Sequence, residues 1–121
     1  MPRNESLEIH VHRNGSGHKP GTFTGPAPKM RVDVGDTMTW TLKVEPPVHP
    51  PDPDPTFVVA FLGPFWPFAG NPAPMNGTTA VAASAPNPTA VNPGSYLYAV
   101  QVTTVDGVYT INHCPEADVG P

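Results

Sequence analysis

The stretch "TMTWTLKV", Thr37–Val44, decides the fold class of this chain. Large apolar residues occupy every second position in it, and threonine and lysine fill the positions between them. A period of two sends the apolar side chains to one face of a β-strand and the polar side chains to the other. The β-branched threonines suit the exposed face of such a strand. We therefore expect a half-buried strand with an inward row formed by Met38, Trp40, Leu42 and Val44.

Similar alternation recurs along the chain. Two further inward rows are expected, one formed by Leu7, Ile9 and Val11 and one by Met30, Val32 and Val34. The segment Thr56–Leu62 is apolar on both faces, which is typical of a central strand. Thr78–Ser84 predicts a short strand, and Ser95–Val105 with Gly107–His113 predicts a hairpin that turns at Asp106-Gly107.

Loops rich in proline and glycine separate these segments. The chain holds 19 Pro and 11 Gly, and the densest run is Pro46–Pro55, "PPVHPPDPDP". Proline removes a backbone donor and fixes φ, so this run predicts an extended arm of the polyproline type. Arg13–Gly21, Gly63–Gly77 and Ala85–Gly94 also read as loops. No segment has both the length and the 3.6-residue period of a helix.

These elements predict one all-β domain over residues 1–121. About seven or eight short strands separated by frequent turns are typical of an antiparallel two-sheet sandwich with a Greek-key order. The chain length suits a single domain with one core.

Composition argues against several functional classes. The formal net charge is −4, only 13% of the residues are charged, and no Lys or Arg follows Lys43. Without a basic stripe, nucleic-acid binding and attachment to anionic membranes are not expected. Cys114 is the only cysteine, which rules out an internal disulfide. The first residues lack an apolar signal core, so the default expectation is cytoplasmic; export without a cleaved signal stays an alternative.

Two segments carry a family resemblance. Gly21–Val44, "GTFTGPAPKMRVDVGDTMTWTLKV", resembles the opening of cupredoxins, and Pro93–Val102, "PGSYLYAVQV", resembles their later Gly-x-Tyr-x-Tyr-x-Cys strand. The resemblance implies a two-sheet Greek-key sandwich. In that family a copper ion is held by two His, one Cys and a weak axial Met, a ligand set suited to electron transfer.

The copper ligands of that pattern are missing here. Val100 stands where the resemblance places the Cys, no His follows it before His113, and no Met follows it at all. Gly63, Pro64 and Phe65 stand where the first ligand loop has Asn and His. We therefore expect no copper and no other cofactor. The chain resembles the members of the family in which the sandwich serves as a scaffold.

A different metal site is an alternative interpretation. His10 and His12 are two positions apart, so both side chains leave the same face of a strand and could share an ion. His113 and Cys114 could add ligands to this pair. Solvated histidines and a half-buried structural cysteine explain the same residues without a metal.

Nothing in the sequence predicts catalysis. Asp52 and Asp54 lie in the proline arm, where water would screen them. There is no glycine-rich phosphate loop before a helix and no Gly-x-Ser-x-Gly elbow. The chain is not expected to be an enzyme.

The clearest candidates for partner binding are two proline-studded loops. Phe65, Trp66 and Phe68 lie between Pro64 and Ala69, where they either close the end of the sandwich or form an exposed patch that docks onto a partner. In the arm, Pro47, Val48, His49 and Pro50 match the proline spacing of polyproline ligands.

The sequence thus predicts a non-catalytic structural or protein-interaction module, a subunit of a homomeric assembly that packs through these loops. The two alternatives are a small copper- or zinc-binding protein and a sandwich that binds carbohydrate or another small ligand. The last would use Trp40, Trp66 or Tyr98 as a stacking surface.

Overall fold

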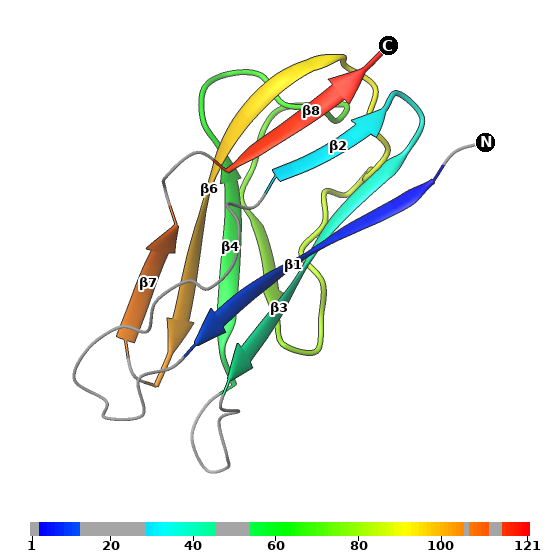
Figure 1. Ribbon diagram of the computed structural model, residues 1–121. Helices are drawn as coiled ribbons and strands as arrows, with labels where there is room; N and C mark the ends of the chain where they lie inside the picture. The colour runs from blue at the N-terminus through cyan, green and yellow to red at the C-terminus, as the bar shows by residue number, and fades with distance from the viewer. Residues whose placement is uncertain (1–2, 13–28, 46–53, 106, 112–114) are drawn as a thin grey trace.

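The computed structural model describes residues 3–12, 29–45, 54–105, 107–111 and 115–121. These residues form two β-sheets and no helix (Figure 1). The smaller sheet pairs β1 (Asn4–His12) with β3 (Thr37–Glu45). The larger sheet has the order β2-β8-β6-β4-β5, with β7 also paired to β6. Its strands are β2 (Lys29–Asp33), β4 (Thr56–Phe61), β5 (Met75–Thr78), β6 (Gly94–Thr104), β7 (Gly107–Ile111) and β8 (Glu116–Gly120).

The core lies between the two sheets, and the predicted period of two produces it. Met38, Trp40, Leu42 and Val44 on β3 are all buried, which confirms the row predicted from "TMTWTLKV". The inward residues of β1, β4 and β6 meet them, so one apolar core joins both sheets. Val34 departs from its expected inward row and is 43% exposed, because β2 ends at Asp33 and a turn follows.

β6 is the strand that makes the large sheet curl. Along one edge it pairs first with β8, from Gly94 to Leu97, and then with β7, from Val100 to Thr104. Along its other edge it pairs with β4. The upper part of β6 therefore continues towards β8 and β2, while the lower part continues towards β7 (Figure 1). The β6–β7 hairpin confirms the prediction for this region; its turn residue Asp106 lies outside the described residues.

The expectation of antiparallel pairing throughout is wrong for two ladders. β1 pairs with β3 in parallel, with Leu7 opposite Trp40, and β2 pairs with β8 in parallel, with Met30 opposite Ala117. Parallel neighbours need a crossover connection, and alternation within a strand does not reveal its partner's direction. β2 lies between β1 and β3 in the sequence but belongs to the other sheet, so the chain crosses the core twice.

The strand predicted at Thr78–Ser84 lies earlier, because β5 begins inside the segment expected to be a loop. Gly77 explains this placement. A Cβ atom added there would lie 2.5 Å from the Phe57 ring, so only glycine lets β5 approach β4 this closely. The chain then returns to β3, where Ala83 and Trp40 exchange backbone hydrogen bonds of 3.0 and 2.8 Å. The segment Ala85–Gly94 thus covers an edge of β3 in part, with its prolines at an edge where missing donors cost little.

Candidate binding surface

The loop after β4 contains the aromatic residues predicted to bind a partner. Leu62 extends the β4–β6 pairing by one hydrogen bond, in which its backbone N–H donates to the Leu97 carbonyl at 2.9 Å. Gly63 then takes a positive φ of 88°, a conformation that favours glycine, and the chain leaves the sheet. The loop is therefore positioned directly at the end of the central strand β4.

Trp66 and Phe68 belong to the core. Trp66 is only 4% exposed, and its ring meets Phe68 edge-on at a centroid separation of 5.2 Å. The Phe68 ring in turn lies 6.4 Å from Trp40 and 6.2 Å from Phe61. Such edge-to-face contacts are favourable for aromatic rings. These two residues therefore close the end of the sandwich, and neither offers a stacking surface to a ligand.

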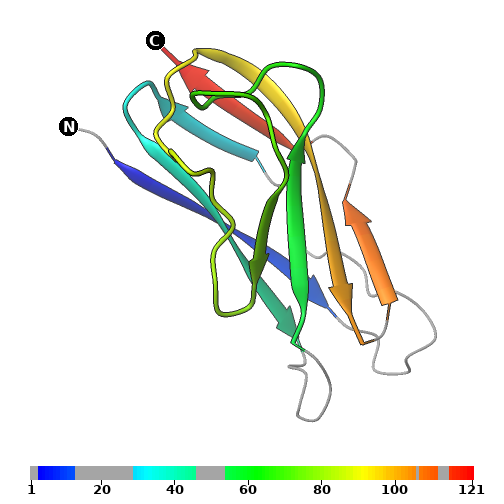
Figure 2. The ribbon, with the colours of Figure 1, turned by 180° about the vertical axis from the view of Figure 1, so that it is seen from behind.

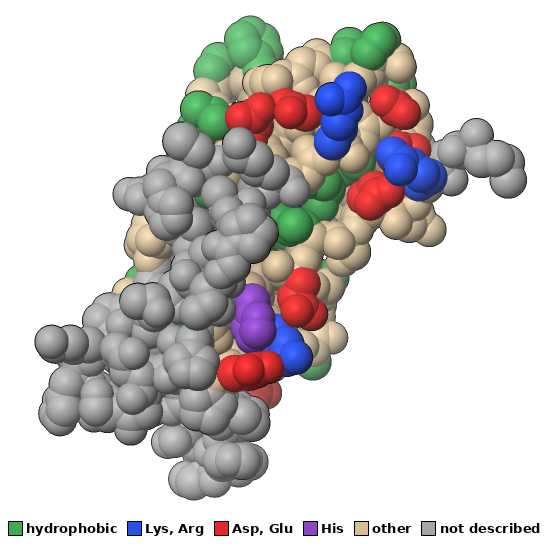
Figure 3. Space-filling model, viewed as in Figure 1, with side chains coloured by type: hydrophobic (Ala, Val, Ile, Leu, Met, Phe, Trp, Pro, Cys, Tyr) green, Lys and Arg blue, Asp and Glu red, His purple; other side chains and the backbone are tan. Residues whose placement is uncertain are grey.

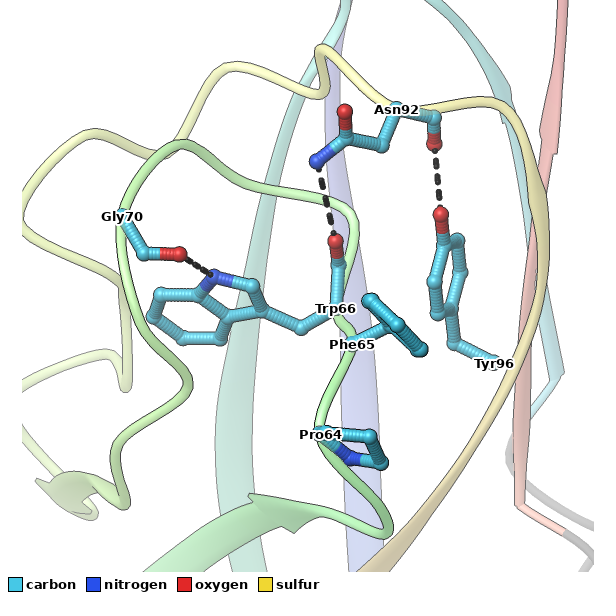
Figure 4. Close-up of a pocket in the computed structure, with 6 residues that line it drawn as sticks. All are labelled: Pro64, Phe65, Trp66, Gly70, Asn92 and Tyr96. Carbon is cyan, nitrogen blue, oxygen red and sulfur yellow. Dashed lines mark hydrogen bonds between the residues drawn. The ribbon is translucent and has the colours of Figure 1, made fainter.

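Asn92 holds the loop in place. Its side-chain amide donates to the Trp66 carbonyl at 3.2 Å and to the Phe68 carbonyl at 3.3 Å. The Trp66 indole Nε1–H donates to the Gly70 carbonyl at 3.0 Å, and the Tyr96 hydroxyl donates to the Asn92 carbonyl at 3.1 Å (Figure 4). The loop conformation is consequently set by hydrogen bonds within the chain, before any partner binds.

Phe65 is the one aromatic side chain of the three candidates that faces solvent. It is 76% exposed and borders a pocket of about 280 Å³. Figure 4 shows the lining residues, which are Pro64, Phe65, Trp66, Gly70, Asn92 and Tyr96. A hollow of this size suits one protruding side chain better than a drug-sized ligand. The lining holds no carboxylate, amine, imidazole or thiol; its polar side-chain groups are the Asn92 amide, the Trp66 indole N–H and the Tyr96 hydroxyl.

Charged side chains lie on the other parts of the molecule. The sequence from Thr56 to Val105, all of it described, contains no Asp, Glu, Lys, Arg or His. Charged contacts lie instead on β1 and β3: Glu45 is 3.0 Å from Lys43 on its own strand and 3.5 Å from His10 on β1. Figure 3 shows acidic and basic side chains over the side formed by β1, β2 and β8. The Phe65 loop thus belongs to a long stretch of the chain without charged side chains.

The histidines of the alternative metal site do not form a cluster in the described residues. His10 lies beside Glu45, and no group of three or more His, Cys, Asp or Glu among the described side chains could hold a metal ion. Lys43 lowers the pKa of Glu45, chiefly through a hydrogen bond, as expected for a surface pair. The side chain of His12, and all of His113 and Cys114, lie outside the described residues, as do Pro47, Val48, His49 and Pro50.

The residues at the positions where the cupredoxin resemblance places copper ligands do not fit a copper ion. Val100 is fully buried in the core, opposite Val59 on β4. Gly63, Pro64 and Phe65 supply neither an imidazole nor a thiolate. Copper of the electron-transfer type requires both kinds of donor. The side chains at these positions are therefore apolar and supply no donor atom for copper.

Sequence reasoning missed the supporting residues of this surface. Asn92 lies in a stretch that the sequence predicts only as a loop, although Asn next to Pro is a turn signal. Leu62 and Leu97 are 58% and 49% exposed and lie side by side, but their pairing depends on the β4–β6 register. The absence of charged residues between Thr56 and Val105 is the sequence signal that these residues share.

No model of a known protein family matches the sequence, and no curated protein matches it at a significant level. Among the described residues, no helix is long and apolar enough to cross a membrane.

Proposed function

We propose that this protein is a non-catalytic interaction module that assembles with copies of itself, using the Phe65 loop as a contact. The observation that carries the proposal is a preformed, uncharged loop end that exposes a phenylalanine beside a pocket of side-chain size. Large aromatic anchors seated in small pockets account for most of the binding energy in protein interfaces. A loop already fixed by Asn92 loses little entropy on docking.

The framework we propose for this module is a cupredoxin-like sandwich that has no copper. The inward aromatic row of β6 and the Val-Gly-Asp-Thr turn before β3 support the resemblance. The buried Val100 supports a structural use of the former ligand position, since a valine there adds to the core. The arm Pro46–Pro55 is a further proposed contact in the assembly on the strength of its sequence.

Self-association of the full chain tests the proposal. In sedimentation velocity over a concentration series, we expect the wild-type protein to form a reversible oligomer. Phe65→Ser should weaken association by about tenfold or more, because it removes the exposed anchor and leaves the core untouched. Val34→Ser, which changes an exposed apolar residue at the β2–β3 turn, is the matched control and should leave association unchanged. A wild type that sediments as a monomer at every concentration would refute the proposal.

A further inference from the structure

The dipeptide Asn76–Gly77 lies in β5, the strand at one edge of the large sheet. Figure 2 shows β5 as a short strand beside β4. Asparagine followed by glycine is the dipeptide most prone to deamidation, because glycine has no Cβ atom to hinder its backbone nitrogen and lets the backbone turn freely. Among the described residues this is the one such step; Asn71, Asn87 and Asn92 each precede a proline, whose nitrogen carries no proton to lose.

Packing forces glycine into this position. A Cβ atom added at Gly77 would lie 2.5 Å from the Phe57 ring and 2.7 Å from the Val81 carbonyl oxygen. The Phe57 side chain is buried in the core, so it cannot move aside without disturbing its neighbours. The fold therefore requires the reactive dipeptide, since a bulkier residue after Asn76 would separate β5 from β4.

Deamidation proceeds through a five-membered succinimide ring. The Gly77 backbone nitrogen forms a bond to the Asn76 side-chain Cγ atom and loses its proton, and the side-chain nitrogen leaves as ammonia. Water then opens the ring at either carbonyl, which leaves an aspartyl or an isoaspartyl residue at position 76. Water is the only co-reactant, and it has access, because the exposed Asn76 side chain borders a hollow of about 410 Å³.

Pairing of β5 with β4 holds the attacking nitrogen away from Cγ. The Thr78 backbone N–H donates to the Val81 carbonyl at 2.8 Å, so it points away from β4. Hydrogen-bonded and non-bonded pairs alternate along an antiparallel ladder, so the Gly77 N–H points towards β4, opposite Phe57. The ring also requires the Asn76 Cβ atom and the Gly77 nitrogen to eclipse each other about the Cα–C bond. A strand, with ψ of about +135°, keeps these two atoms well apart.

We propose that Asn76 is a deamidation site whose reaction is controlled by the pairing of β5 with β4. The site is protected while the strands pair and reacts when the edge strand opens. β5 has four residues, and Met75 is its one large buried side chain. A short edge segment of this kind opens at a lower free energy than the whole molecule unfolds. This inference is independent of the proposed self-assembly.

The products of deamidation do not restore the pairing. An isoaspartyl residue adds one carbon atom to the backbone, so the residues after it shift and Gly77 no longer lies opposite Phe57. Either product places a carboxylate opposite Val58, in the stretch from Thr56 to Val105 that contains no charged residue. Deamidation thus marks the molecules in which β5 has opened and keeps that edge from closing again.

Peptide mapping by mass spectrometry tests the site in the full wild-type chain. The protein is incubated at mildly alkaline pH, either folded or unfolded in guanidinium chloride, and the aspartyl and isoaspartyl forms at position 76 are counted together over time. We expect deamidation of Asn76 to be at least about tenfold slower in the folded protein, because it occurs only in the open state. Asn14–Gly15, which lies outside the described residues, is counted separately.

Two methionine variants separate local opening of β5 from unfolding of the whole chain. Met75→Ala removes the buried side chain of β5 and should accelerate deamidation of the folded protein by about tenfold or more. Met30→Ala removes the same atoms from the core at β2, the opposite edge of the large sheet, and is the matched control. It should leave the rate at Asn76 close to the wild-type rate.

Protection in the folded wild type, together with acceleration by Met75→Ala alone, supports the proposal. Equal rates in the folded and unfolded wild type would overturn it, as would the absence of any reaction at Asn76 in the unfolded chain. Equal acceleration by both variants, or none by Met75→Ala, would show that strand opening at β5 does not control the reaction. If an alanine variant does not fold, Met75→Val and Met30→Val replace the pair, and the wild-type comparison stands without them.

Discussion

Asp36 fastens the start of β1 to the β2–β3 turn. Its buried carboxylate accepts the backbone N–H of Arg3 at 2.8 Å and that of Asp33 at 2.9 Å. The Arg3 guanidinium adds a contact of 3.3 Å. The backbone hydrogen bond from Asp33 is the largest cause that lowers the pKa of this carboxyl, followed by that from Arg3. One acidic side chain therefore links the start of β1 to the end of β2 and the turn that follows it.

Asp36→Asn is expected to destabilise the protein at neutral pH, because an amide cannot accept all of these hydrogen bonds. A carboxyl whose pKa is lowered in the folded state stabilises it above the unfolded pKa of about 3.9. That contribution disappears as the pH falls through the lower folded value. Urea unfolding at neutral and acidic pH should thus show a gap between wild type and variant that closes below about pH 4. Asp33→Asn is the control, since its backbone N–H remains; an equal gap at all pH values would contradict this role.

Tyr98 makes the stability of the folded protein decrease at alkaline pH. Burial against Trp40 and Phe61 raises the pKa of its phenol to about 12. The unfolded chain releases this proton near pH 10, so stability should fall between about pH 10 and pH 12, by up to about 1.4 kcal/mol per pH unit. Tyr98→Phe should flatten that part of the urea-unfolding profile. A variant profile as steep as the wild type would show that other groups cause the loss.

At the scale of elements, β8 links β2 to the rest of the large sheet. It pairs in parallel with β2 and antiparallel with β6, and its Ala117 and Val119 enter the core. Local periodicity does not predict this strand, because its apolar pattern has only two members and glycine and proline follow them. Its partners are distant in sequence, and only the fold brings them together.

Val119→Ala should therefore lower the free energy of unfolding by about 2 kcal/mol, since it removes two buried carbon atoms. Val105→Ala makes the same change at an exposed position and should cost less than about 0.5 kcal/mol. Urea unfolding at neutral pH measures both. Equal costs for the two variants would mean that β8 does not contribute to the core.

Features that depend on alternation within one strand can be predicted from the sequence. Features that depend on which strands pair cannot. The inward row of β3 and the β6–β7 hairpin follow from local periodicity and a Gly turn. The parallel ladders and the early start of β5 depend on contacts across the fold, such as Gly77 against Phe57. At the candidate site, the sequence predicts the aromatic loop. It does not show which of its rings close the end of the sandwich and which are exposed. Trp66 is buried and Phe65 exposed in a loop whose Trp66 carbonyl accepts from Asn92, 26 residues further along the chain.

At the scale of the whole molecule, the chain divides into two sides of different character. Charged side chains lie on β1, β2, β3 and β8, whereas the strands β4, β5, β6 and β7 and the Phe65 loop contain none. A protein with this division can stay in solution through one side and associate through the other. This division, more than any single residue, is the basis of the account given for its function.

Sedimentation equilibrium of the full wild-type chain tests this claim most directly. The account predicts an average mass that rises with concentration from 12.8 kDa towards twice that value or beyond, and that falls back when Phe65 is replaced by Ser. A mass that remains at 12.8 kDa over the whole concentration range would contradict it.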